Sequence, residues 1–261
     1  MTKIGIIGGS GLDNPDILEH PLDQALTTRW GAPSTHLKHG KIAGVDVVLL
    51  GRHGREHTIT PTHVNYRANV QALKDSGCTH ILATTAVGSL RENIGRGDLV
   101  ILDQFIDFTK QRAMGFHETF APHQPVHTPM ADPFDKQLRA ILIDLCNQRA
   151  QRFHDCGTVV TIEGPRFSTR AESRMFRAWG ADVINMSVAT EVALANEAGI
   201  PYAAGAMSTD YDCWKTDEEP VSWDAILNVF NNNAKKVTSL LVEAIPLIAR
   251  GGREKAQSTA N

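Results

Sequence analysis

The 261-residue sequence lacks the features that mark several large classes of protein. No apolar run approaches the ~20 residues that a helix needs to cross a bilayer, so we expect no membrane partner. The 26 Lys and Arg residues against 29 Asp and Glu residues give a net charge of -3, and we therefore expect no nucleic-acid partner. The four cysteines show no CxxC pairing, which favours a reducing, cytoplasmic setting.

Short motifs of several nucleotide-binding and hydrolytic sites are also missing. The dinucleotide fingerprint GxGxxG fails, because in the stretch that begins at Gly9 its third glycine position holds Asn14. The chain has no P-loop Gly-Lys-Ser/Thr and no GxSxG nucleophile elbow, and its histidines have no convincing metal-ligand spacing. These absences argue against a metal site. They also argue against a nicotinamide-dependent oxidoreductase, and binding of NAD would support that alternative.

The residues that are present indicate a globular α/β protein. Hydrophobic residues make up 42% of the chain and charged residues 21%, a balance that can bury a real core. Strand-like runs alternate with helical patterns, which predicts a mostly parallel sheet covered by helices. Strands are expected at 4–7, 47–50, 80–84, 99–105, 159–162, 183–186 and 202–207, and helices at 65–74, 136–148, 170–179, 191–198 and 222–244. Without a repeat or linker, residues 1–250 are expected to form one domain and 251–261 a polar, mobile tail.

The stretch 181–212 combines strand, helix and strand with polar groups at both strand ends. Asn185, Met186 and Ser187 lie at a strand-to-helix turn, and Asp210 and Asp212 follow the second strand. Ligands of open α/β sheets bind beyond the carboxyl ends of the strands. If the chain is still extended there, the two carboxylates face one small space and repel each other, and a dry pocket disfavours charge, so one of them is expected to hold a proton near neutral pH. The alternative is a solvated acidic turn.

Several other strand ends carry groups that could bind an anion. Ser10 lies in a glycine turn, Arg52 and His53 follow the second strand, and Thr85 and Ala86 follow the third. Glycine turns expose backbone amides, and Arg offers a planar fork that suits phosphate. Each signal alone is weak, since tight turns and solvated loop clusters look the same. Together with Ser187 they predict a site for a phosphate-sized anion.

A further strand is followed by the turn that contains Phe167 and Ser168. Phe167 could stack on a planar ring and Ser168 could hydrogen-bond its edge. The alternative is a Gly-Pro turn with Phe167 in the core.

Long motifs along nearly the whole chain identify a resemblance to a known family. They are GIIGGSGLD, GRHGREHTITPTHVNYRANVQALK, ILATTAVGSL, GDLVILDQFID, TIEGPRFSTRAES, WGADVINMS and STDYDCWK. In this order they resemble the trimeric purine nucleoside phosphorylases, and most closely their 5′-methylthioadenosine branch. The resemblance implies one α/β domain around a mixed, partly barrel-like sheet. It implies a homotrimer that uses phosphate to split methylthioadenosine into adenine and a 5-thioribose 1-phosphate. Inorganic phosphate would be a co-substrate, and no metal or organic cofactor is implied.

The resemblance also assigns residues to parts of the site. Phosphate would be bound by Ser10, Arg52, His53, Thr85, Ala86 and Ser187. Met186, next to Asn185, would lie under the ribose, and the purine would contact Phe167, Ser168, Asp210 and Asp212. The 5′ pocket would be lined by Trp223, Ile226 and Leu227, with His127 contributed by the long loop 111–133 of a neighbouring subunit.

The chemistry of these residues fits the implied reaction. A carboxylic acid at Asp210 could protonate ring nitrogen 7 of the departing purine, and a phosphate dianion could stabilise the cationic sugar. The 6-oxopurine branch has Asn at the position of Asp210, so a 6-aminopurine is expected here. Trp223 replaces a smaller aliphatic residue of the relatives, which would reshape the 5′ pocket. A broader phosphorylase that takes adenosine, inosine or 5′-methylthioinosine and a non-catalytic nucleoside-binding protein are the competing hypotheses.

Overall fold

The computed structural model describes residues 1–8, 17–149, 152–217 and 222–258. The strands are β1 (Lys3–Gly8), β2 (Glu19–Gln24), β3 (Leu37–Ile42), β4 (Val45–Gly51), β5 (His80–Ser89), β6 (Leu99–Ile101), β7 (Gln104–Phe108), β8 (Phe153–His154), β9 (Thr158–Ile162), β10 (Val183–Asn185) and β11 (Tyr202–Asp210). The α-helices are α1 (Tyr66–Asp75), α2 (Lys136–Gln148), α3 (Arg170–Ala178), α4 (Val188–Glu197) and α5 (Trp223–Ser258). Two short 3-10 helices, Arg55–His57 and Pro61–His63, follow β4.

Strand β5 organises the sheet. Within the described residues, eleven strands form one sheet, in which β5 pairs in parallel with β1 and β11 and its end pairs antiparallel with β10. Strand β11 continues on its other side to β6, and β10 continues to β9 and β7. Because parallel and antiparallel pairs occur in the same sheet, the fold is the mixed α/β architecture that the resemblance implies.

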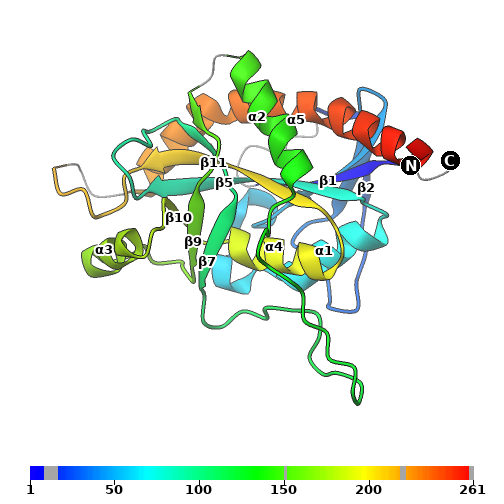
Figure 1. Cartoon of the computed structure of the whole chain (residues 1–261), viewed down its shortest axis with the longest axis horizontal. Coiled ribbons are helices and arrows are strands. Elements are labelled where there is room, and N and C mark those ends of the chain that lie inside the picture. Colours follow the sequence, from blue (N-terminus) through cyan, green and yellow to red (C-terminus); the bar gives the residue numbers. More distant parts are fainter. Residues whose placement is uncertain (9–16, 150–151, 218–221, 259–261) are drawn as a thin grey trace.

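Helices cover both faces of this sheet (Figure 1). One buried cluster packs α2 and α5 against the sheet, for example through Leu142 and Leu241, and another packs α1 and α4 on the opposite face, through Leu73 and Val192. A third, smaller cluster places Phe176 of α3 against β9 and β10. With both faces covered, ligand access is left to the strand ends.

Several predicted element boundaries are wrong, and three of the differences change the sheet or the last helix. The expected strand 99–105 is two strands, because β6 pairs with β11 and β8 whereas β7 pairs with β9. Residues 85–89 belong to β5 and are not a turn after it. The last helix does not end at Ala244: α5 continues past Pro246 to Ser258, so residues 251–258 are helical.

Candidate active site

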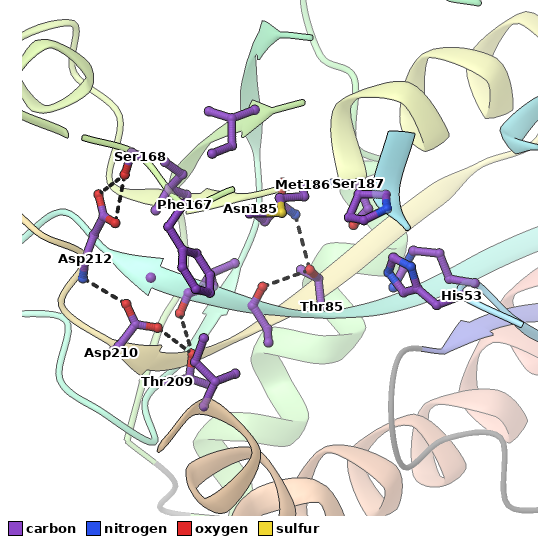
Figure 2. A pocket seen from close by; sticks show the side chains of 18 of the residues that line it. His53, Thr85, Phe167, Ser168, Asn185, Met186, Ser187, Thr209, Asp210 and Asp212 are labelled. Carbon is purple, nitrogen blue, oxygen red and sulfur yellow. Dashed lines mark hydrogen bonds between the residues drawn. The ribbon is translucent and has the colours of Figure 1, made fainter. Parts of the chain in front are cut away.

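One pocket opens at the carboxyl ends of β4, β5, β9, β10 and β11 (Figure 2). Most of the sequence-predicted site residues line it: Arg52, His53, Thr85, Ala86, Phe167, Ser168, Asn185, Met186, Ser187, Asp210, Asp212, Ile226 and Leu227. Asp210, Asp212 and Ser168 lie toward one end in this view, and His53 and Ser187 lie toward the other. The pocket therefore has an acidic end and an end that faces a helix N-terminus.

Asp210 and Asp212 do not lie on one extended strand, which is the condition under which their i, i+2 spacing predicts that both side chains point the same way. Strand β11 ends at Asp210, and Asp212 has a positive φ of 37°, so the chain has already turned. The backbone N–H of Asp212 donates to Oδ1 of Asp210 at 2.9 Å. The turn therefore donates a backbone hydrogen bond to the carboxylate of Asp210.

Burial raises the pKa of Asp210 to about 6, and the charge of Asp212 adds a smaller contribution in the same direction. Hydrogen bonds from the Asp212 N–H and the Thr209 hydroxyl oppose this shift. Of the two causes that the sequence suggests for a raised pKa, the dry pocket therefore contributes more than the repulsion between the two carboxylates. Asp210 can hold a proton or release it within the physiological pH range.

Ser168 connects the acidic turn to the segment before α3. Its Oγ lies 2.9 Å and 2.7 Å from the two carboxylate oxygens of Asp212, and its one proton can be donated to either. Phe167, its neighbour, is 41% exposed and lines the pocket, so it is not a core residue. An exposed ring beside a carboxylate suits a planar ligand with hydrogen-bond donors on its edge.

Arg52 is buried beneath the other end of the pocket. Its guanidinium donates to both carboxylate oxygens of Glu191 in α4 and, at 2.9 Å, to the carbonyl of Thr84. Tyr202 donates its hydroxyl to Oε2 of Glu191 at 2.9 Å. The predicted phosphate ligand is therefore half of a buried ion pair, and the described bonds occupy three of its five N–H groups.

His53 is neutral near pH 7. Burial and the neighbouring Arg52 lower its pKa to about 4. Nδ1 lies 3.0 Å from the carbonyl of Ile59, which can only accept, so Nδ1 carries the proton and Nε2 is a hydrogen-bond acceptor. The ring of His57 stacks on it with centroids 4.4 Å apart.

The N-terminus of α4 differs from the other helix N-termini that the structure describes with a capping bond. Asn65, Asp135 and Thr169 cap α1, α2 and α3 through side-chain oxygens, whereas Ser187 makes no capping bond at α4. A helix N-terminus whose N–H groups face a pocket favours an anion. This is the location at which the sequence predicts phosphate.

Asn185 fixes the turn that leads into α4. Its amide donates to Thr85 Oγ1 at 3.2 Å, and its carbonyl oxygen accepts from Thr161 Oγ1 at 2.8 Å. Thr161 also accepts from the backbone N–H of Ala189 at 3.1 Å. Sequence reasoning missed Thr161, because a threonine inside an apolar strand gives no signal of its own.

Three predicted residues are not seen in the pocket. Ser10 and the side chain of Trp223 lie outside the described residues. His127 is exposed on the long loop before α2, which extends away from the body of the chain in Figure 1, and it does not line the pocket. Its assignment to a neighbouring subunit's site stays a prediction.

The structure also adds residues that sequence reasoning missed. Thr209 and Gly88 line the acidic end, and Glu191 pairs with Arg52. Thr209 belongs to the quoted motif STDYDCWK, but its role depends on strand register. Among the described residues, no group of His, Cys, Asp and Glu is arranged to hold a metal ion, and no helix is both long and apolar enough for a bilayer span.

Comparisons with known proteins agree on one family. The model of the Phosphorylase superfamily matches residues 3–246. The S-methyl-5′-thioadenosine phosphorylase of Xenopus tropicalis is 58% identical over 95% of this chain and 89% of its own, and that of Danio rerio is 56% identical over 95% and 90%. The solved methylthioadenosine phosphorylase of Schistosoma mansoni, in complex with adenine, has a TM-score of 0.91 and 44% identity over 96% of this chain and 93% of its own. The chain belongs to the Phosphorylase superfamily and, within it, to the family of S-methyl-5′-thioadenosine phosphorylases.

Proposed function

We propose that the chain catalyses the phosphorolysis of S-methyl-5′-thioadenosine to adenine and 5-methylthioribose 1-phosphate. The observation that carries the proposal is the arrangement of one pocket, in which a buried acid at Asp210 lies opposite the N-terminus of α4, where the Ser187 side chain makes no capping bond. A relative from Schistosoma mansoni, 43% identical with a TM-score of 0.89, was solved as a variant in complex with methylthioadenosine.

In the proposed reaction, Asp210 gives its proton to ring nitrogen 7 of the purine as the C1′–N9 bond breaks. An oxygen of hydrogenphosphate bonds to C1′, and the sugar 1-phosphate forms. Hydrogenphosphate releases its proton to solvent and Asp210 regains one from solvent, so the net result is one proton moved from phosphate to adenine. An acid with a pKa of about 6 suits this step, because it is partly protonated at neutral pH and its carboxylate is a stable product.

Phosphate is assigned to the opposite end. Ser187 offers a hydroxyl, and the first N–H groups of α4 provide the positive end of a helix dipole. Nε2 of His53 accepts the hydrogen bond of the phosphate O–H, which suits hydrogenphosphate better than a fully ionised oxygen. Arg52 is charged but neutralised by Glu191, so it acts through its remaining N–H groups. Thr85, Ala86 and Ser10 stay predicted phosphate ligands.

The base and the 5′ group are assigned to the rest of the pocket. Phe167 and Ser168 with Asp212 would bind the purine, and Met186 would support the ribose. Ile226 and Leu227 offer apolar side chains at the start of α5, which suit a thioether, and Trp223 would join them. A carboxyl group at the purine edge accepts from a 6-amino group, and this supports adenine as the base.

We also propose that the chain works as a homotrimer in which His127 completes a neighbouring subunit's 5′ pocket. The loop that carries His127 exposes Met114, Phe120 and Val126, each at least 40% exposed. Exposed apolar residues gathered on one loop support a role in assembly. Light scattering on the purified protein tests the trimer, and a mass of one chain would reject it.

The proposed mechanism needs no metal or organic cofactor, because residues of the chain supply the proton and bind the phosphate. Activity should therefore survive exhaustive treatment with a chelator. A cytoplasmic location is the matching proposal for the compartment, and the four cysteines, all of which are free, support it. Cell fractionation tests the compartment.

The decisive experiment compares kcat/KM for methylthioadenosine, adenosine and inosine, with phosphate present and absent. We expect phosphate-dependent release of adenine with methylthioadenosine preferred, and Asp210→Asn should shift the preference toward inosine. Preference of the wild-type protein for inosine, or cleavage without phosphate, would contradict the proposal. A relative named adenosine/methylthioadenosine phosphorylase favours adenosine as the second candidate substrate, and equal kcat/KM for both nucleosides would support that broader function.

A further inference from the structure

The hydroxyl of Thr209 has one proton and two acceptors within reach. Its Oγ1 lies 2.8 Å from Oδ2 of Asp210 and 3.2 Å from the carbonyl oxygen of Val87 on β5 (Figure 2). A carbonyl oxygen can only accept, whereas a carboxyl oxygen can accept or, when protonated, donate. The Thr209 hydroxyl can therefore donate to only one of the two neighbours at a time.

A β-bulge makes this arrangement possible. Along β11, Ser208 is paired with Val87 and Asp210 with Gly88, so Thr209 is an extra residue without a partner in the register. In a regular strand, consecutive side chains point to opposite faces and could not bond. The extra residue re-aims its neighbours, so the side chains of Thr209 and Asp210 meet inside the sheet edge, where both residues are buried.

We propose that Thr209 is a positioning residue whose hydroxyl turns between Asp210 and the Val87 carbonyl as Asp210 loses and regains its proton. When Asp210 is ionised, Thr209 donates to Oδ2. When Asp210 is protonated on Oδ2, the hydroxyl donates to Val87, and its oxygen can accept the carboxyl proton. This inference rests on the proposed function, in which Asp210 is the acid that protonates the leaving purine.

The second oxygen of Asp210 lacks this freedom. Oδ1 accepts from the backbone N–H of Asp212 at 2.9 Å, and this donor cannot become an acceptor. The charged groups that act on Asp210 are Asp212 in the following turn, which raises its pKa, and Arg96 in the segment between β5 and β6, which lowers it. Gly88 on the paired strand carries no charge. Of these two hydrogen-bond partners, Thr209 is therefore the one that can bond to Asp210 in both its ionised and its protonated state.

In the catalytic step the O–H group of Asp210 leaves the Thr209 oxygen and its proton passes to ring nitrogen 7 of the purine, and no other covalent bond of Asp210 changes. The hydroxyl of Thr209 then turns from Val87 to the new carboxylate. A donor that follows the developing charge stabilises the transition state more than the ground state, which is the condition for raising kcat. Reprotonation of Asp210 from solvent reverses the turn.

The experiment compares Thr209→Val, which removes the hydroxyl with little change of shape, with Thr209→Ser, which keeps it. The readout is kcat/KM against pH, where activity falls as Asp210 ionises. Loss of a hydrogen bond to a charged group should move the basic limb of Thr209→Val up by about one pH unit or more and lower the plateau roughly tenfold or more. Thr209→Ser should keep both the position of the basic limb and the height of the kcat/KM plateau close to the wild-type values.

A second readout does not depend on turnover. The carboxylic acid C=O stretch of Asp210, identified in infrared spectra by its loss in Asp210→Asn, should titrate at higher pH in Thr209→Val. If Thr209→Val does not fold, Thr209→Ala is titrated in its place. A reduced plateau with an unmoved limb and unmoved infrared titration would mean that Thr209 only packs, and would overturn the inference.

The pH profiles distinguish a failure of the proposed function from a failure of this inference alone. If Asp210→Asn keeps the basic limb of the wild-type profile, Asp210 is not the acid, and both the proposed function of Asp210 and this inference fail together. If Asp210→Asn loses the limb while Thr209→Val keeps it in place, only the inference fails.

Discussion

Because Gly88 has no side chain, the carboxyl group of Asp210 can lie close to β5. A Cβ atom at this position would lie 2.9 Å from Oδ1 of Asp210 and 3.0 Å from Cγ2 of Ile184. The closest obstacle is the end of a side chain, so Gly88→Ala should fold, with the carboxyl group of Asp210 displaced. A displacement of about 1 Å at a catalytic group costs on the order of 100-fold in rate. We expect kcat/KM of Gly88→Ala to fall by about that factor with little change in Tm.

Gly205→Ala is the matched control for this prediction. Gly205 lies on the adjoining strand β11, and a Cβ there would meet only Cδ1 of Leu99, at an ordinary contact distance of 3.4 Å. This variant should keep full activity. Equal losses in Gly88→Ala and Gly205→Ala would mean that the sheet, not Asp210, is sensitive to the added methyl group.

At this scale the sequence predicts residues whose chemistry is local. Asp210 could be found because an acid follows an apolar strand, and Ser187 because a hydroxyl begins a helix. Gly88 and Thr209 could not be found in this way, since their importance comes from the register between β5 and β11. Asp212 was found and lines the same pocket as Asp210, but the chain has already turned there at a positive φ, so the i, i+2 spacing of an extended strand does not describe how the two residues are placed.

At the scale of elements, α4 presents its N-terminus to the pocket and holds Arg52 in place through Glu191. Both residues are buried, and Tyr202 adds a third hydrogen bond to the carboxylate. Leaving one charge of a buried pair without its partner costs about 3–5 kcal/mol. Arg52→Met and Glu191→Leu should each lower the free energy of unfolding by about that amount.

The double variant tests whether the pair acts as a unit. Arg52→Met with Glu191→Leu should cost clearly less than the sum of the single variants in denaturant unfolding, because no charge is left unpaired. In the same double variant, KM for phosphate should rise more than KM for the nucleoside, since the remaining guanidinium donors are gone. Additive losses of stability would contradict a coupled pair.

Element type was more predictable than element extent. The pattern of α5 predicts an end at Ala244, because Pro246 removes a backbone donor and disfavours a helix. The helix nevertheless continues, with Ile245 and Ile248 buried on the sheet beside Leu241, so tertiary packing outweighs the local penalty. The split of 99–105 into β6 and β7 likewise depends on strand partners that no local pattern reveals.

At the scale of the whole molecule, the loop that carries His127 is the part that a single chain does not explain. If His127 serves the site of a neighbouring subunit, each site takes Asp210 from one chain and His127 from another, so His127→Ala and Asp210→Asn remove side chains that different chains supply. Mixing the two variants through dissociation and reassembly should create sites with native Asp210 from one chain and native His127 from the next. We expect kcat to rise above that of either variant taken through the same procedure alone. No rise would mean that His127 acts within its own chain or not at all.

Burial of Asp210 should make the free energy of unfolding of the whole fold depend on pH. The pKa of Asp210 is raised from 3.8 to about 6 on folding. The folded state therefore binds the proton more tightly, and the related stability is present below pH 3.8 and lost as pH rises through 6. Asp210→Asn, which cannot ionise, escapes this loss. It should be more stable than wild type by about 3 kcal/mol at pH 8 and by roughly half of that at pH 5.

Denaturant unfolding of wild type and Asp210→Asn at both pH values measures this difference. The exposed acid Asp144 on α2 provides the control, because an Asp144→Asn change removes a carboxylate that is not buried. That variant should show the same small difference from wild type at pH 5 and pH 8. Because active-site acids are selected for chemistry and not for stability, the gain in Asp210→Asn should coincide with the loss of phosphorolysis of the aminopurine nucleoside. A variant that is less stable than wild type at pH 8 would show that the hydrogen bonds from Asp212 and Thr209 outweigh the cost of burial.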